Sequence, residues 1–117
     1  MKKVIMLFGT FDILHIGHIN LFEQAKKIGD KLVVVVARDV NVKKNKNKKT
    51  LFCETERLKV LKNIKLIDEV LLGDENNPYK IIKITKPNII ALGYDQNTYV
   101  DGLKSFLKDN NLPTKIL

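Results

Sequence analysis

The stretch GTFDILHIGH, residues 9–18, decides the fold and contains both histidines of the chain. It follows the apolar run Val4–Phe8, which reads as a buried strand, and precedes a segment in which apolar residues recur at helical spacing between Leu21 and Ile28. A second apolar run, Leu32–Ala37, contains four consecutive valines and is typical of an interior strand of a parallel sheet. These segments predict a strand–helix–strand unit in which residues 9–18 join the first strand to the helix.

Further strands and helices alternate along the rest of the chain. We expect strands at Glu69–Leu72, Asn88–Leu92 and Thr114–Leu117, and helices at Glu54–Asn63, around Tyr79–Ile84 and from about Val100 to Asn110. Five strands alternating with four helices predict an α/β fold, a Rossmann-like three-layer sandwich with a five-stranded parallel sheet. In such a sheet, ligands bind beyond the carboxyl ends of the strands, where the strand order reverses.

Size and composition indicate one compact domain. The chain has 117 residues, of which 44% are hydrophobic, so we expect a single domain over residues 1–117. The single Cys53 has no partner in the chain and points to a reducing compartment, so a cytoplasmic location is expected. The run Val4–Phe8 is too short for a signal peptide or a membrane span, and no membrane partner is expected.

The net charge of +8 favours anionic partners, and lysines supply most of it. Five of the seven residues in Lys43–Lys49 are lysines, which reads either as a solvated flexible loop or as a phosphate-binding loop. No Phe or Tyr is interleaved with these lysines, so stacking platforms for nucleic acid are not evident. Phosphorylated small molecules are therefore the favoured partners.

The residues of the first turn suit a phosphate chain. Gly9 and Thr10 follow the end of the first strand, and the next helix begins at Gly17, where unpaired backbone N–H groups favour an anion. Because His15 and His18 are three residues apart, both imidazoles can donate to one polyphosphate. Gly17 has no side chain, which lets a nucleotide approach the backbone closely.

Two other readings of the histidines are weaker. One histidine could cap or pack while the other is incidental, but both fall in one ten-residue stretch that also contains glycines. A metal site would use Asp12, His15 and His18, yet no CxxC or second histidine cluster completes it, so no protein-held metal is expected. The pattern of a P-loop is also absent.

With these residues the chain resembles the cytidylyltransferase-like nucleotidyltransferases, whose signature is a strand followed by G-T-[FY]-D-x-x-H-x-G-H. The resemblance continues through the segments Gly29–Asp30, Ala37–Asp39, Glu56–Arg57, Ile67–Val70 and Leu92–Gln96. Class I aminoacyl-tRNA synthetases share the HxGH element but carry a Lys-Met-Ser-Lys-Ser loop that is absent here. The resemblance implies transfer of a nucleotidyl group from a nucleoside triphosphate to a phosphorylated acceptor, with release of pyrophosphate.

Two subfamilies compete within this group. The archaeal-type FAD synthases transfer an adenylyl group from ATP to FMN, and the glycerol-3-phosphate cytidylyltransferases use CTP. The segments Val36–Asp39 and Gly93–Gln96 look like the first, so ATP is favoured and CTP is the alternative. Tyr94 and Tyr99 also suit stacking on a flavin ring better than recognition of glycerol.

The expected reaction needs positioning and charge stabilisation rather than a nucleophilic residue, because the acceptor phosphate is already anionic. His15 and His18 would hold the triphosphate and stabilise charge on the bridging oxygen, while Thr10 and Phe11 would add polar and backbone contacts. Mg²⁺ is the expected cofactor, held mainly by the nucleotide phosphates.

Basic side chains complete the expected catalytic set. Lys44 and Lys46 are candidates to hold the acceptor phosphate or the leaving group, although spacing does not decide which lysine of 43–49 does so. Only two arginines occur, and Arg57 is the stronger phosphate candidate, with Arg38 second. The alternative for each arginine is a surface ion pair.

The segment after the fourth strand is the remaining part of the expected nucleotide site, and it consists of Gly93, Tyr94, Asp95 and Gln96. Asp95 would bind ribose hydroxyls or, alternatively, cap the next helix. Members of the family usually continue past the fifth strand into an Arg-containing loop and a last helix, which the chain is expected to lack because it stops at Leu117. A homodimer is expected, and a non-catalytic nucleotide- or nucleic-acid-binding module is the alternative of another class.

Overall fold

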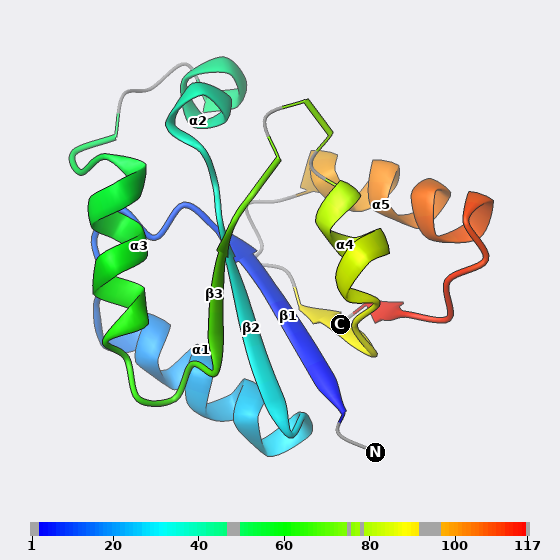
Figure 1. Cartoon of the computed structure of the whole chain (residues 1–117), viewed down its shortest axis with the longest axis horizontal. Helices are drawn as coiled ribbons and strands as arrows, with labels where there is room; N and C mark the ends of the chain where they lie inside the picture. The colour runs from blue at the N-terminus through cyan, green and yellow to red at the C-terminus, as the bar shows by residue number, and fades with distance from the viewer. Residues whose placement is uncertain (1–2, 47–49, 75, 78, 92–96, 117) are drawn as a thin grey trace.

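The structure is a computed structural model that describes residues 3–46, 50–74, 76–77, 79–91 and 97–116 (Figure 1). Ten elements follow one another in the order β1 (Val4–Gly9), α1 (Ile16–Ile28), β2 (Lys31–Val36), α2 (Asp39–Lys46), α3 (Glu54–Lys62), β3 (Glu69–Leu72), α4 (Lys80–Thr85), β4 (Ile89–Ala91), α5 (Asn97–Asp109) and β5 (Lys115–Ile116). Within these ranges no helix is long and apolar enough to cross a membrane.

The strands form one parallel sheet in the order β3-β2-β1-β4-β5. β1 is the central strand, and it pairs with β2 from Val4 opposite Lys31 to Gly9 opposite Val36. On its other side, Ile5 of β1 lies opposite Ile89 of β4. The chain therefore builds one half of the sheet outward from β1 and then returns to build the other half. The predicted three-layer α/β sandwich is confirmed.

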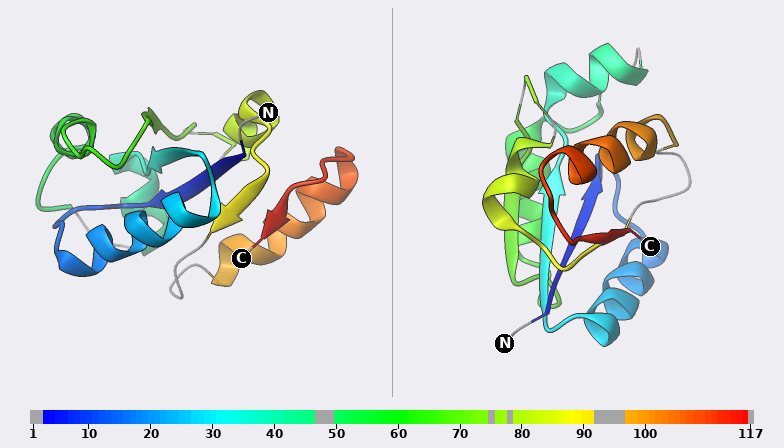
Figure 2. Two further views of the ribbon diagram at one scale, coloured as in Figure 1. Left: turned by 90° about the horizontal axis from the view of Figure 1, so that it is seen from below. Right: turned by 90° about the vertical axis from the view of Figure 1, so that its right-hand side faces the viewer.

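The two faces of the sheet are covered by different helices, because successive side chains of a strand point to opposite faces. Ile5 and Leu7 of β1 pack with Phe22 of α1 and Leu61 of α3. Met6, between them in sequence, packs on the other face with a cluster that includes residues of α4 and α5. Figure 1 shows α1 and α3 on one side of the sheet and α4 and α5 on the other, and Figure 2 shows these layers from two further directions.

The lysine-rich segment departs from its sequence-based description as a loop. Residues 39–46 form helix α2, and Figure 1 shows it beyond the carboxyl end of β2. The amphipathic signal of this helix is weak because lysines and asparagines surround a single anchor, Val42, which is only 5% exposed. The prediction of a loop is therefore wrong for Lys43–Lys46, which continue the helix that Val42 anchors.

Candidate active site

The candidate site lies at the carboxyl end of β1, where the order of the sheet reverses between β2 and β4. Residues 10–15 leave this strand end and lead into α1, which begins at Ile16. This start is one residue before the predicted start at Gly17, and polar side chains cap the first turn. Those side chains belong to the two histidines singled out from the sequence.

His15 and His18 form a reciprocal cap at the N-terminus of α1. Nδ1 of His15 accepts the backbone N–H of Gly17 at 3.0 Å, and Nδ1 of His18 accepts the backbone N–H of His15 at 3.2 Å. An imidazole nitrogen that accepts carries no proton, so these bonds assign the proton of each neutral ring to Nε2. The ring centroids are 4.1 Å apart. The cap thus aligns two Nε2–H donors at one helix terminus.

The neutral form of His18 is favoured by its surroundings. Burial lowers the pKa of His18 below its ordinary value, and the nearby His15 lowers it further by charge repulsion. A neutral His18 keeps Nδ1 as an acceptor for the helix cap and Nε2–H as a donor. A protonated ring would lose the acceptor, because both of its nitrogens then carry hydrogen. The neutral form of His18 is therefore the form that both caps the helix through Nδ1 and keeps Nε2–H as a donor.

Phe11 supports His18 from the strand side. The residue is 7% exposed, and the centroid of its ring lies 5.6 Å from that of His18, in an edge-on arrangement, and 5.9 Å from that of Phe22. Its backbone has φ 52°, in the left-handed region, which costs about 1–2 kcal/mol for a residue with a side chain. Such a conformation persists only where the neighbouring structure fixes it. The loop after β1 is thus held in an unusual shape that places an aromatic ring under His18.

Two glycines of the motif are explained by close contacts within the protein. A Cβ atom on Gly17 would lie 2.7 Å from Cε1 and 2.9 Å from Nδ1 of the His15 ring. A Cβ atom on Gly9 would lie 2.8 Å from two carbons of the Phe11 ring. Gly17, predicted to let a nucleotide approach the backbone, thus also leaves room for the His15 ring.

Asp12 binds the chain that returns from the lysine-rich segment. Its two carboxylate oxygens accept the backbone N–H groups of Leu51 at 2.7 Å and Phe52 at 2.8 Å. The carboxylate is therefore engaged in joining two segments rather than directed at an ion. Among the residues that the structure describes, no group of three or more His, Cys, Asp or Glu side chains is placed to hold a metal ion.

Arg57 is buried and bonded within the protein. The residue is 1% exposed, and its guanidinium donates to the carbonyl oxygens of Thr10 at 2.7 Å and Phe52 at 3.1 Å and to Oδ1 of Asp39 at 2.5 Å. It is not the surface ion pair that was the alternative reading. Each guanidinium nitrogen of Arg57 thus donates to a protein acceptor, and a direct contact with phosphate stays a prediction.

Arg38 and Asp39 follow β2 and extend this network. Arg38 donates to the carbonyl oxygen of Gly73 at 2.8 Å and pairs with Glu54 at 3.2 Å. Burial alone would raise the pKa of Asp39, but the N–H of Glu54, the bond and charge of Arg57 and the hydroxyl of Thr50 together lower it below its ordinary value. Asp39 therefore stays ionised, which the buried guanidinium requires.

Asp12, Asp39 and Glu54 are site-forming residues that the sequence argument did not assign. Asp39 stands two residues after the predicted strand Leu32–Ala37, at the carboxyl edge of the sheet, which was an available signal. The partners of these carboxylates lie 11–40 residues away, beyond the reach of local spacing. Nothing in a single sequence joins such distant positions.

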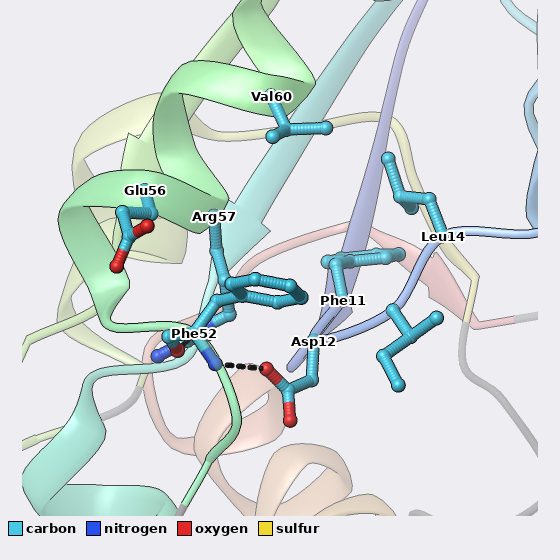
Figure 3. Close-up of a pocket in the computed structure, with 8 residues that line it drawn as sticks. Phe11, Asp12, Leu14, Phe52, Glu56, Arg57 and Val60 are labelled. Atoms are coloured by element: carbon cyan, nitrogen blue, oxygen red, sulfur yellow. Dashed lines mark hydrogen bonds between the residues drawn. The ribbon is translucent and has the colours of Figure 1, made fainter.

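A groove of about 370 Å³ lies between the loop after β1 and helix α3, as Figure 3 shows. Its lining residues are Phe11, Asp12, Ile13, Leu14, Phe52, Glu56, Arg57 and Val60. Neither histidine lines it, so the groove lies beside the two imidazole rings rather than over them. Residues of α3 and of the loop after β1 line the groove together.

The remaining expected residues are only partly covered by the structure. Lys44 and Lys46 belong to α2, and their side chains lie outside the described part. The segment Gly93, Tyr94, Asp95 and Gln96 also lies outside the described residues. The structure brings Gly9, Thr10, Phe11, Gly17 and both histidines together, with Arg57 bonded to Thr10.

The family model described as "Cytidylyltransferase-like" matches residues 6–113, and the chain belongs to this family. A protein of Thermococcus sibiricus named FAD synthase is 44% identical over 99% of this chain and 80% of its own length. A protein of Ferroglobus placidus with the same name is 44% identical over 100% of this chain and 75% of its own length.

Two solved structures share the fold. A protein of Thermoplasma volcanium described as a lipopolysaccharide core biosynthesis protein has a TM-score of 0.89 and 40% identity, with 99% of this chain and 94% of the other covered. A pantoate-beta-alanine ligase of Francisella tularensis has a TM-score of 0.66 and 22% identity, over 99% of this chain and 58% of the other. The second likeness concerns the fold alone.

Proposed function

We propose that this protein is an FMN adenylyltransferase, an FAD synthase, which transfers AMP from ATP to the phosphate of FMN and releases pyrophosphate. The observation that carries the proposal is the pair of Nε2–H donors that His15 and His18 present at the start of α1, directly beyond β1. The relatives named FAD synthase, which match nearly the whole chain at 44% identity, support the choice of ATP and FMN.

The chemistry is an in-line displacement at the α-phosphorus of ATP. An oxygen of the FMN phosphate forms the new bond, and the bond from the α-phosphorus to the oxygen shared with the β-phosphate breaks, so that this oxygen leaves with pyrophosphate. Negative charge grows on the leaving oxygen. The Nε2–H groups of His15 and His18 are proposed to donate to the triphosphate there, and the N-terminus of α1 adds a partial positive charge.

The other expected residues enter as parts of the same proposal. Lys44 and Lys46 would hold the FMN phosphate or the leaving pyrophosphate, and the segment 93–96 would hold the nucleoside. Mg²⁺ would neutralise charge on the phosphates. Both oxygens of Asp12 already accept backbone N–H groups. Phosphate oxygens and water are therefore expected to supply most of the ligands of Mg²⁺. The proposal also includes a single domain, a homodimer and a cytoplasmic enzyme.

Turnover with purified protein tests the assignment. We expect pyrophosphate release and FAD formation from ATP, FMN and Mg²⁺, with CTP and glycerol 3-phosphate as a poorer pair. His18→Ala should lower turnover by about 100-fold or more, because it removes a donor that acts on developing charge. Its circular dichroism spectrum should match the wild type.

Two outcomes would contradict the proposal. Turnover of only the CTP pair would exclude FAD synthesis while leaving the phosphate site in place. Unchanged turnover in His18→Ala would exclude the histidine pair as the catalytic donors. The exposed Gln24 on α1 supplies the matched control, since Gln24→Ala changes the same helix away from its N-terminus and should turn over normally.

A further inference from the structure

Arg57 connects three separate stretches of the chain through one guanidinium. Its Nη1 donates to Thr10 at the end of β1, its Nε to Phe52 before α3, and its Nη2 to Asp39 at the start of α2. A buried guanidinium is stable only when its charge is paired and its N–H groups are bonded. The three acceptors therefore have to stay in place around it, and it in turn holds them.

The bond to Thr10 also sets the direction of the next amide. In a trans peptide the carbonyl oxygen and the following N–H point to opposite sides of the chain. While Arg57 holds the Thr10 oxygen on the side of α3, the N–H of Phe11 points away from α3. The left-handed φ of Phe11 makes this orientation costly to reach without support. Arg57 thus acts on the backbone at Thr10 and Phe11, two residues that were predicted from the sequence to add polar and backbone contacts to the triphosphate.

Asp39 ties both ends of the lysine-rich segment to the same guanidinium. Besides Arg57, its Oδ1 accepts the hydroxyl of Thr50 at 3.2 Å and its Oδ2 accepts the N–H of Glu54 at 3.0 Å. In the reciprocal bond, Oε1 of Glu54 accepts the N–H of Asp39 at 2.9 Å. Asp39 precedes Lys43–Lys49 and Thr50 follows it, so one carboxylate joins the two ends of that segment.

From these contacts we infer that Arg57 and Asp39 are a positioning pair. They tie Asp39 and Thr50, which lie on either side of the lysine-rich segment, to the backbone of Thr10 after β1, and so fix the backbone at Thr10 and Phe11 for contact with the triphosphate. The hydrogen-bond network shows which groups the pair holds together. That the groups so held bind phosphate rests on the proposed function. Arg57 acts here through Thr10 and Asp39 rather than by touching substrate, which revises its expected place among the phosphate ligands.

Two conservative variants test the pair. Arg57→Lys keeps the positive charge but replaces the planar guanidinium with a single ammonium group. The ammonium group cannot donate to Thr10, Phe52 and Asp39 at once. Asp39→Asn keeps the shape of the side chain and removes its charge. Lys26→Gln is the matched control, because it breaks a 2.8 Å ion pair to Asp68 at the opposite end of the strands.

Turnover and amide exchange are the two measurements. Both variants should lower kcat with ATP and FMN by about 10- to 100-fold, with a smaller change in KM, because misplaced phosphate groups matter most in the transition state. The double variant should lose little more than either single one, since the two residues act as one unit. Lys26→Gln should keep the wild-type kcat.

Amide exchange without substrate separates this inference from the proposed function. We expect faster exchange in the variants at residues 10–14 and 50–52, with the strand β2 unchanged. If the wild type failed to use FMN while this local pattern appeared, the function would be wrong and the positioning pair would hold. Wild-type kcat in Arg57→Lys, or faster exchange spread evenly over β2, would overturn the inference in favour of a general stabilising role.

Discussion

At the scale of single residues, the two histidine rings of the first turn cap helix α1 and are also the proposed hydrogen-bond donors to the triphosphate. Nδ1 of His15 is occupied by the Gly17 amide, so the ring has one orientation in which Nε2–H faces outward from the cap. Gly17 leaves room for this orientation because it has no Cβ. A contact inside the protein therefore accounts for the glycine of the HxGH spacing, beside the proposed approach of a nucleotide.

Gly17→Ala should therefore displace the His15 ring. The added methyl would overlap Cε1 and Nδ1 of that ring, so the ring has to turn away from the Gly17 amide. We expect turnover to fall about tenfold or more, while the melting temperature stays near the wild-type value because alanine favours the helix. Imidazole NMR signals would report the movement of His15. Normal turnover with an unmoved ring would show that the site tolerates the methyl group.

At the scale of elements, helix α1 depends on His15 for its first turn. Asparagine at the N-cap can also accept the Gly17 amide, whereas alanine cannot. His15→Ala should lower the free energy of unfolding by about 1 kcal/mol, and His15→Asn should leave it nearly unchanged. Both should lose about 100-fold in turnover, because neither has an imidazole donor.

Urea unfolding together with pyrophosphate release separates the two contributions of His15. If His15→Asn retained turnover, capping alone would explain the residue and the proposed donor would be His18 by itself. If both variants unfolded like the wild type, the cap would contribute nothing to stability. The two readouts are independent, so each contribution is tested separately.

The helices and strands differ in how well the sequence predicted them. Strand β2 was predictable because Val33–Val36 form an apolar run of strand length, and β3 was predicted at its observed bounds. Helix α2 was missed because its pattern has one buried anchor, Val42, among polar residues. The loop from β1 to α1 was predictable from adjacent residues, and its binding of phosphate stays a prediction, while the contact of Arg57 with Thr10 joins positions 47 residues apart and required the fold.

At the scale of the whole molecule, acid should destabilise the protein in two steps. The pKa of His18 is lowered by burial and by His15, so the unfolded chain binds a proton first as the pH falls below about 6.5. The pKa of Asp39 is also lowered, although burial opposes the shift, so the unfolded chain again binds more protons below about pH 4. Both differences make stability fall with falling pH.

Urea unfolding at a series of pH values checks these signs. The free energy of unfolding should decline from about pH 7 until folded His18 is protonated, and again from about pH 5 until folded Asp39 is protonated. His18→Gln should flatten the upper step and Asp39→Asn the lower one. A stability that rose on acidification through either window would contradict the corresponding pKa direction.

The position of β1 at the centre of the sheet has a consequence for synthesis on the ribosome. Its two neighbours are completed far apart in time, because β2 ends at Val36 while β4 ends at Ala91. At about 5–20 residues per second, the nascent chain spends several seconds with one edge of β1 unpaired. The contacts of Thr10, Asp12, Asp39 and Arg57 all lie within the first half of the chain. The loop between β1 and α1 is therefore expected to form before the sheet is closed, and the late strands β4 and β5 then cover an exposed apolar edge.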